Sequence, residues 1–192
     1  MQFLVTAAVF LLSSLTATAA PSAAPLGRSE VLESRQTTCN PAPTPEQLID
    51  NINGWQVDIN NVNSFLNAFP TINNTLDLQN GAVTALINAS NEPTRLAFLA
   101  QQCGACGSTA CDAQFQGAVS ALMDMFPKVP TDLSNIANLM NVQGNVDEIN
   151  QVRCCVVLPS AQTLFTKTVA SLKVTGVTTF VRLANACAAI RC

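Results

Sequence analysis

Eight cysteines behind an apolar N-terminal run restrict the fold of this chain more than any other feature of its sequence. An even number of cysteines in this setting is typical of a secreted protein whose cysteines pair as disulfides. The Cys103-Gly104-Ala105-Cys106 motif also allows a redox or zinc site, but an oxidising compartment favours disulfides. We therefore expect four structural bridges among the cysteines, which are Cys39, Cys103, Cys106, Cys111, Cys154, Cys155, Cys187 and Cys192.

The N-terminal segment has the features of a signal peptide. Residues 3–15 are apolar but too short to span a bilayer, and Ala17-Thr18-Ala19 offers small residues for cleavage. We predict a signal peptide over residues 1–19, which directs the protein to the extracellular space or the cell wall. Residues 20–38 are rich in Pro, Ala and Ser and are expected to form a disordered arm or a propeptide. The alternative to an uncut arm is a cut after Arg35, because the surrounding residues resemble single-arginine propeptide sites of secreted fungal proteins.

The residue composition excludes several kinds of chemistry. The chain has no histidine, so it has neither a Ser-His-Asp nor a Cys-His arrangement and no histidine metal ligand. Nine Lys and Arg face 12 Asp and Glu, and the basic residues are scattered, which is unlike a nucleic-acid-binding protein. The adjacent acidic pair Asp147-Glu148 lies at an expected helix start, where the helix dipole favours acidic residues. We expect no enzyme activity, no catalytic residue, no cofactor and no metal.

The clearest local signal is a helix that begins near residue 44. Thr44-Pro45-Glu46-Gln47 combines an N-cap residue, a proline at the first helical position and a glutamine that can complete a capping box. Apolar residues then follow at alternating spacings of four and three, which places them on one helix face. They are Leu48, Ile52, Trp55, Ile59, Val62, Leu66 and Phe69, and Pro70 follows them.

Similar periodicity continues to the C-terminus without the alternation typical of strands. We predict a single all-α domain over residues 39–192, a compact disulfide-stapled bundle of six to eight helices. A helix from about residue 74 to residue 89 is expected to bury Leu76, Val83, Leu86 and Ile87. A new helix is expected to open at Asn91-Glu92-Pro93, and the last helix is expected over residues 177–190.

The neighbouring residues Cys154 and Cys155 point about 100° apart on a helix, so each is expected to staple a different element. We expect one of them to bridge toward the cluster between Cys103 and Cys111, and the other toward another segment. Cys39 would then hold the N-terminal arm. Cys187 and Cys192 would fix the last helix.

Two N-glycosylation sequons lie in the predicted domain. Asn73-Asn74-Thr75 and Asn88-Ala89-Ser90 both match the acceptor pattern, so Asn73 and Asn88 are candidate glycosylation sites. Only 11% of the residues are charged, so the polar surface consists largely of Asn, Gln, Ser and Thr. Glycans are expected to contribute to the solubility of such a surface.

Part of the chain resembles a known family. The run Val57-Asp58-Ile59-Asn60-Asn61-Val62 and the segment Leu66 to Phe69 carry the likeness. On these residues, the segment from Leu48 to Leu86 resembles the hydrophobic-surface-binding protein A family of secreted fungal proteins. The resemblance implies a helical protein that coats apolar surfaces or the cell wall. The adjacent cysteine pair also resembles that of eight-cysteine helical lipid carriers such as plant lipid-transfer proteins, although their following C-x-C is missing here.

These observations support one leading hypothesis and two alternatives. The leading hypothesis is a secreted non-catalytic protein that contacts the cell wall, an apolar surface or a host component. The first alternative is a carrier that holds a lipid or another apolar ligand inside the bundle. The second is an apoplastic effector or inhibitor that binds a specific protein. None of the three involves nucleic acid or an integral membrane protein.

Overall fold

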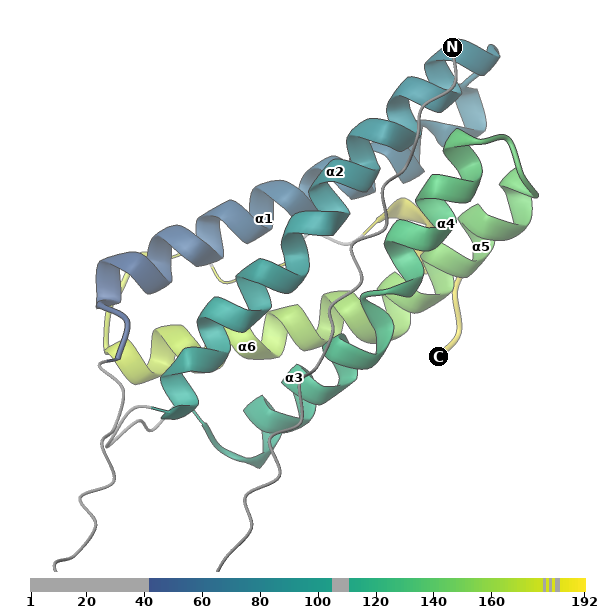
Figure 1. Cartoon of the computed structure of the whole chain (residues 1–192). Helices are drawn as coiled ribbons and strands as arrows, with labels where there is room; N and C mark the ends of the chain where they lie inside the picture. Colours follow the sequence, from purple (N-terminus) through teal and green to yellow (C-terminus); the bar gives the residue numbers. More distant parts are fainter. Residues whose placement is uncertain (1–41, 105–110, 178, 180, 182–183) are drawn as a thin grey trace, which may run out of the picture. The chain divides into compact units, whose positions relative to one another are not determined.

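The protein is described by a computed structural model over residues 42–104, 111–177, 179, 181 and 184–192, which belong to the compact unit Thr38–Cys192. The predicted signal peptide (1–19), the arm with Arg35 (20–38), Cys39 and Cys106 lie outside the described residues. Throughout the described part the chain is mainly helical and contains no strand, which confirms the predicted all-α class (Figure 1).

The helical elements follow one another with short connections. The α-helices are α1 (Pro45–Ala68), α2 (Thr75–Ala100), α3 (Ala113–Met125), α4 (Lys128–Ala137), α5 (Val142–Val152) and α6 (Leu158–Leu172). A π-helix, η3 (Arg153–Val157), joins α5 directly to α6. Short 3₁₀ helices are η1 (Phe69–Thr71), η2 (Gln101–Gly104) and η4 (Asn185–Ala188).

The prediction of six to eight separate helices is too high, because neighbouring segments join into longer rods. Phe126 and Pro127, between α3 and α4, both keep right-handed helical backbone angles. The π-helix makes α5 and α6 continuous in the same way. The described chain therefore forms four rods, which are α1, α2, α3 with α4, and α5 with α6.

The capping box predicted at residue 44 is confirmed. The Thr44 hydroxyl accepts a hydrogen bond from the Gln47 backbone N–H at 3.3 Å, and the Gln47 side chain accepts one from the Thr44 N–H at 2.9 Å. The predicted stripe on α1 is buried from Leu48 to Leu66, and Phe69 packs partly buried against the core. A local signal that agrees with the tertiary packing therefore fixes this helix.

The expected break before Pro93 is absent, because α2 runs through it. Proline has helical φ but no N–H, so Pro93 costs the helix the hydrogen bond to the Ala89 carbonyl without ending it. The residue before it, Glu92, points into the core and is 1% exposed. The hydrogen bonds that the Glu92 carboxylate accepts in the core favour an uninterrupted helix at this point.

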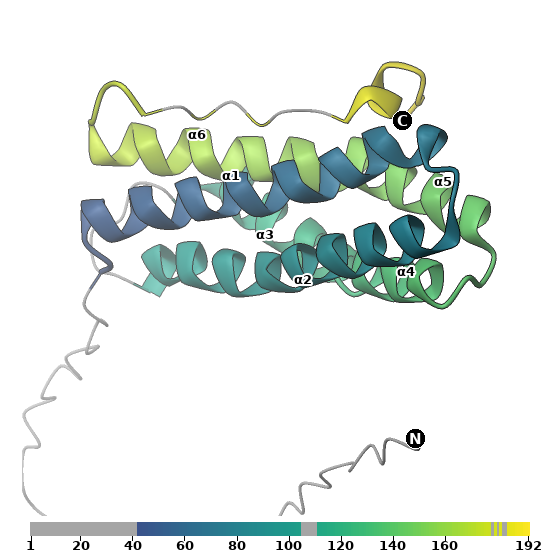
Figure 2. The same cartoon turned by 90° about the horizontal axis from the view of Figure 1, so that it is seen from above.

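The rods pack around Trp55 on α1, which is fully buried. α1 lies against α2, α2 against α4, α4 against α5, and α3 against α6 (Figure 2). The Trp55 ring centroid lies 6.0 Å from that of Phe126 at the end of α3, and 5.3 Å from that of Phe165 on α6. Its indole N–H donates to Glu92 Oε2 on α2 at 3.3 Å. This α1 side chain therefore contacts each of the other three rods.

A buried ion pair lies in the same core. Arg153 Nη1 donates to Glu92 Oε1 at 2.9 Å, and both side chains are almost completely buried. Arg153 Nε donates to Asn63 Oδ1 at 3.3 Å, and Nη2 donates to the Ile59 carbonyl at 3.4 Å. The guanidinium thus joins the α5–α6 rod to both α1 and α2. Its partners satisfy the polar atoms that burial would otherwise leave without hydrogen bonds.

Arg153 is also the first residue of the π-helix. In η3 the Leu158 N–H donates to the Arg153 carbonyl, five residues back. Pro159 follows, and because it has no N–H it cannot donate to the Cys155 carbonyl as an α-helix requires. The wider turn lets the rod continue past this proline while Arg153 faces the core.

The expected last helix is absent from the described residues. Lys173 has positive φ and caps the end of α6, and Gly176 has positive φ shortly after it. The segment Lys173–Cys192 is here called the C-terminal strap, and its described residues form one helix, the short η4. The strap begins with a run rich in Val and Thr, whose β-branched side chains disfavour helix. Val181 and Ala184 of the strap are buried. Phe180 lies outside the described residues.

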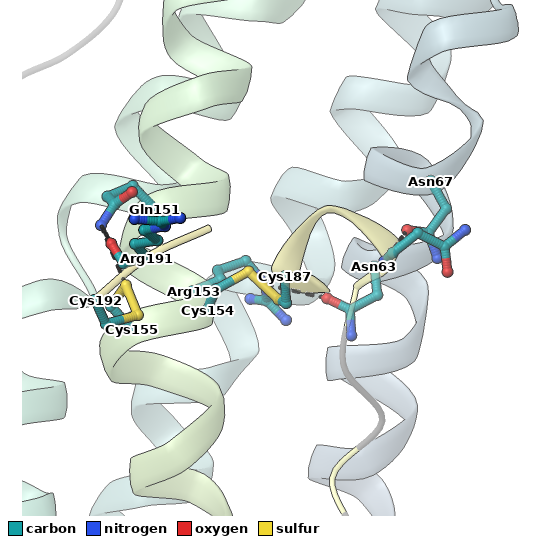
Figure 3. Close-up of a disulfide and its surroundings, with 10 residues drawn as sticks. Asn63, Asn67, Gln151, Arg153, Cys154, Cys155, Cys187, Arg191 and Cys192 are labelled. Carbon is teal, nitrogen blue, oxygen red and sulfur yellow. Dashed lines mark hydrogen bonds between the residues drawn. A yellow bond between two sulfur atoms is a disulfide. The ribbon is translucent and has the colours of Figure 1, made fainter. Parts of the chain in front are cut away.

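Two disulfides fasten the end of the strap to the π-helix. Cys154 pairs with Cys187, and Cys155 pairs with Cys192 (Figure 3). The expectation that these neighbours staple different elements is wrong, because the strap returns to the level of the pair and both bonds go to it. Cys103 pairs instead with Cys111, which joins η2 to the start of α3.

Hydrogen bonds place the strap against α1 and the α5–α6 rod. The Val181 N–H donates to Gln162 Oε1 on α6, and the Asn185 N–H donates to Asn67 Oδ1 on α1, both at 2.7 Å. Gln151 Nε2 contacts the Arg191 carbonyl at 3.4 Å. The strap therefore lies across both rods near the Cys154–Cys155 pair.

A double-mutant cycle tests the buried ion pair. Arg153→Met leaves the Glu92 carboxylate buried without its cation, so we expect a loss of about 3–5 kcal/mol in unfolding free energy. Glu92→Gln leaves the guanidinium without its anion and is expected to cost a similar amount. The double variant is expected to lose clearly less than the sum of the two. Guanidinium chloride unfolding measures all four proteins, and additive losses would contradict the coupling.

The two strap disulfides are expected to act cooperatively. They close overlapping loops with sequence separations of 33 and 37, so either one alone removes most of the loop entropy of the unfolded chain. Replacing one Cys pair by Ser is expected to cost about 2 kcal/mol, and replacing both pairs about 6 kcal/mol, from loop-closure entropy. Chemical unfolding of the three variants measures this. A double loss no larger than the sum of the single losses would show that the loops are not coupled.

Candidate functional site

The candidate site is an aliphatic stripe on the outer face of α2, formed by Leu76, Val83 and Ile87. At 3.6 residues per turn these three positions fall within about 40° of one another around the helix. They are 65%, 45% and 60% exposed. About 17 Å of helix separates the first from the last, at 1.5 Å per residue. Large aliphatic side chains therefore line the side of α2 that faces away from the core.

The sequence pattern predicted that these side chains lie in the core, and that prediction is wrong. The buried face of α2 carries Ala82, Ala85 and Ala89 instead, on the opposite side of the helix. Gly81 reinforces this, because a Cβ there would approach the Phe65 ring to 2.9 Å. Small residues let α2 pack closely against the other rods, and the larger aliphatic residues remain outside.

Polar bonds along the seam between α1 and α2 fix the orientation of the stripe. Asp58 on α1 accepts hydrogen bonds from Asn91 at 3.2 Å and from Arg95 at 3.1 Å on α2. Asn51 Nδ2 donates to the Arg95 carbonyl at 2.9 Å. Any rotation of α2 that buried Ile87 would break these bonds and move the alanine face out of the core.

An apolar groove lies on the side of α2 that faces the bend between α3 and α4. Its volume is about 380 Å³. The Ser90 hydroxyl lies at the groove and donates a hydrogen bond to the Leu86 carbonyl at 2.8 Å. Among the described residues its lining includes no charged side chain and consists of Ser90, Pro93, Leu96, Met123, Phe126, Pro127 and Pro130.

The stripe and the groove are adjacent along α2. Ile87 precedes Ser90 by three residues, which places the two on neighbouring turns of one helix face. Met123 is 58% exposed and lies at the groove. We call the combination of the stripe and the groove the α2 apolar face. Other exposed aliphatic side chains in the described part lie on other elements, at Val57 on α1 and at Leu139 and Met140 after α4.

The buried Arg153–Glu92 pair is a second candidate for a functional site, because π-helices and buried charges often occur at such sites. Here Arg153, Glu92 and Trp55 are each at most 1% exposed. A substrate has no access to a group that is closed off in this way. The pair is therefore assigned to the architecture of the bundle.

Two ion pairs join charged side chains on the surface of the described part. Lys128 on α4 pairs with Glu148 on α5, and Lys167 on α6 pairs with Asp112 at 2.5 Å. The neighbouring Asp147 accepts a hydrogen bond from Gln143 at 2.8 Å. Within the described residues no three His, Cys, Asp or Glu side chains are grouped so that they could hold a metal ion.

These pairs shift the pKa values of their members. The hydrogen bond to Glu148 raises the pKa of Lys128, and the hydrogen bond from Lys167 lowers the pKa of the Asp112 carboxyl. Asp132 on α4 behaves differently. Burial is the main cause that raises its pKa, and the charge of Glu148 adds to the effect. Its Oδ2 is buried and accepts no hydrogen bond from any described residue.

The candidate residues taken from the sequence are scattered over the fold. Six of the eight cysteines form the three disulfides described above, and Cys39 and Cys106 lie outside the described residues. Asn73 is exposed in the connection before α2, whereas Asn88 is half-buried on α2. The α2 apolar face was not predicted from the sequence, although the alanines at positions 82, 85 and 89 were a signal that their side of the helix packs against the other rods.

No protein-family model, curated protein or solved structure matches this chain. None of the helices among the described residues combines the length and the apolar character that crossing a membrane requires. The functional assignment therefore rests on the geometry of the described surface.

Asp132 gives a pH-dependent prediction for stability. A carboxyl whose pKa is raised in the folded state destabilises that state when it is ionised, and this penalty disappears as the pH falls through the raised pKa. Asp132→Asn is therefore expected to gain about 1 kcal/mol in unfolding free energy at neutral pH, and the gain should vanish in acid. Denaturant unfolding across pH measures it. The exposed Asp124→Asn on α3 is the matched control, and an equal gain in both variants would contradict the assignment.

Proposed function

We propose that this protein is a secreted, non-catalytic protein that binds apolar surfaces, such as those at a cell wall, through the α2 apolar face. The observation that carries the proposal is the aliphatic stripe at Leu76, Val83 and Ile87, exposed on the side of α2 opposite to its buried alanines. The three disulfides among the described residues support an extracellular setting.

The energy of such a contact comes from removing apolar area from water. Each Å² of buried apolar surface contributes roughly 25 cal/mol, so a contact of a few hundred Å² provides several kcal/mol before ordering costs. The stripe belongs to a helix that is already folded, so little chain order is lost on contact. The groove beside it adds apolar area without a charged side chain that would have to be desolvated.

Two other functions remain as rivals. A carrier of lipid or another apolar ligand would bind one molecule with a fixed stoichiometry, and the groove beside α2 is its candidate position. An effector or inhibitor would need a specific protein partner, and it would show little preference for apolar over hydrophilic materials. The α2 stripe favours extended contact over a carrier, because it lies on the outer side of the helix and not inside the bundle.

Adsorption measurements test the proposal. We expect the protein to bind alkyl-coated beads and to leave hydrophilic beads of the same material unbound. Retention should persist in high salt, because no charge pair is being screened. It should also stay constant between about pH 6 and pH 8, where no side chain of ordinary pKa titrates in a chain without histidine. Equal retention on both kinds of bead, or release by moderate salt, would count against the proposal.

A triple variant locates the contact. Leu76→Gln/Val83→Gln/Ile87→Gln keeps good helix formers on an exposed face, so the fold should survive, as circular dichroism will check. We expect its affinity for alkyl-coated beads to fall about tenfold or more, since each 1.4 kcal/mol of lost contact is a factor of ten. Val57→Gln/Met140→Gln removes exposed aliphatic side chains that do not belong to α2 and is the matched control. A similar loss in the control would show that general hydrophobicity, and not the α2 apolar face, drives adsorption.

A further inference from the structure

We propose that Asn73 is the N-glycosylated residue of this domain, that Asn88 is left unmodified, and that the glycan stands at one end of the α2 stripe. This inference rests on the secretion included in the proposed function. The two sequons are equivalent as sequence patterns. Their positions in the fold are not.

Asn73 stands where a glycan can project into solvent. It lies in the connection between η1 and α2, is exposed, and directly precedes the N-cap residue Asn74. The cap uses the Asn74 side chain, which accepts from the Asp77 N–H at 2.8 Å. The next sequon residue, Thr75, is the exposed first residue of α2. A sugar on Asn73 therefore leaves the helix start and its capping bond in place.

Asn88 is held in the middle of α2 by both ends of its amide. Its Nδ2 donates to the Thr84 carbonyl at 2.7 Å, and its Oδ1 accepts from Asn61 Nδ2 on α1 at 2.9 Å. The side chain is half-buried beside the α1–α2 seam. A sugar on this Nδ2 would have to leave the seam and break at least the contact to Asn61. Folding of α2 against α1 thus opposes a glycan at this position.

The chemistry requires a free side-chain amide and a glycan donor. The co-reactant is an oligosaccharide linked to a lipid through a diphosphate. The asparagine Nδ2 attacks C1 of the first sugar, and the bond from C1 to the diphosphate oxygen breaks with its electron pair leaving on that oxygen. Nδ2 loses one proton to a base and keeps the other. The reaction therefore needs an accessible Nδ2, which Asn73 offers and the folded Asn88 does not.

The position of the glycan also bears on the stripe. Asn73 lies three residues before Leu76, the first exposed aliphatic side chain of α2. Ile87 lies about 17 Å further along the helix, at 1.5 Å per residue. A glycan on Asn73 therefore stands beside the Leu76 end and leaves Val83, Ile87 and the groove open for contact. A glycan on Asn88 would stand beside Ile87 in the middle of the face.

Mass spectrometry of secreted protein tests the inference. The full chain is produced in a eukaryotic host behind a heterologous leader, so that glycosylation is tested even if its own N-terminal segment fails to direct secretion. Glycosidase treatment converts a glycosylated Asn to Asp, which peptide mapping locates. We expect conversion at Asn73 alone, loss of the glycan in Asn73→Gln and in Thr75→Ala, and no change in Asn88→Gln. Conversion at Asn88, or an unmodified Asn73 in secreted protein, would overturn the inference.

Adsorption of the same samples separates this inference from the proposed function. Enzymatic removal of the Asn73 glycan is expected to strengthen binding to alkyl-coated beads severalfold, because the Leu76 end of the stripe becomes accessible. A glycan at Asn73 together with no adsorption in either form would refute the proposed function and leave the glycosylation site intact. Adsorption without any glycan at Asn73 would refute the glycosylation site and leave the proposed function intact.

Discussion

The arrangement of the bundle depends on the buried pair between Arg153 and Glu92. A guanidinium and a carboxylate without water must meet each other closely, since either one alone in the core costs several kcal/mol. The pair links the π-helix to α2, and Trp55 donates to the same carboxylate from α1. A shift of one rod along another would break these bonds. Such a pair adds little to net stability, but it disfavours other alignments of the rods, because those would separate the two charges. A bundle with few other charges has little else that opposes such alignments.

The same alignment determines which side of α2 faces solvent. With Glu92 turned inward, Ala82, Ala85 and Ala89 must also face the core, because they share its side of the helix. The small side chains permit close packing between the rods, and the larger residues Leu76, Val83 and Ile87 are left on the outer side. The candidate binding face is therefore a consequence of the buried ion pair. A helix rotated to bury these aliphatic residues would expose Glu92 and deprive Arg153 of its anion.

The sequence predicted elements wherever local signals agreed with the final packing. The capping box at Thr44 and the stripe from Leu48 are both local, and both are present in the structure. The predicted helix start at Pro93 was wrong because proline normally marks a helix start. Here the tertiary hydrogen bonds of Glu92 favour a helix that continues past Pro93. The α2 face was misassigned because helical periodicity shows that one side is apolar and not which side packs. The strap was misread because its contacts with α1 and α6 come from distant parts of the chain.

A protein that works by contact with apolar surfaces must resist unfolding on them. Such a surface can bind the core residues as well as the outer stripe, so adsorption favours opening unless the folded state is held by other constraints. The Cys154–Cys187 and Cys155–Cys192 bonds hold the strap closed and limit the freedom of the unfolded chain. The buried ion pair opposes opening of the α2 side, because separating the rods would leave both charges in an apolar setting. These constraints allow the α2 apolar face to touch a surface while the core stays closed.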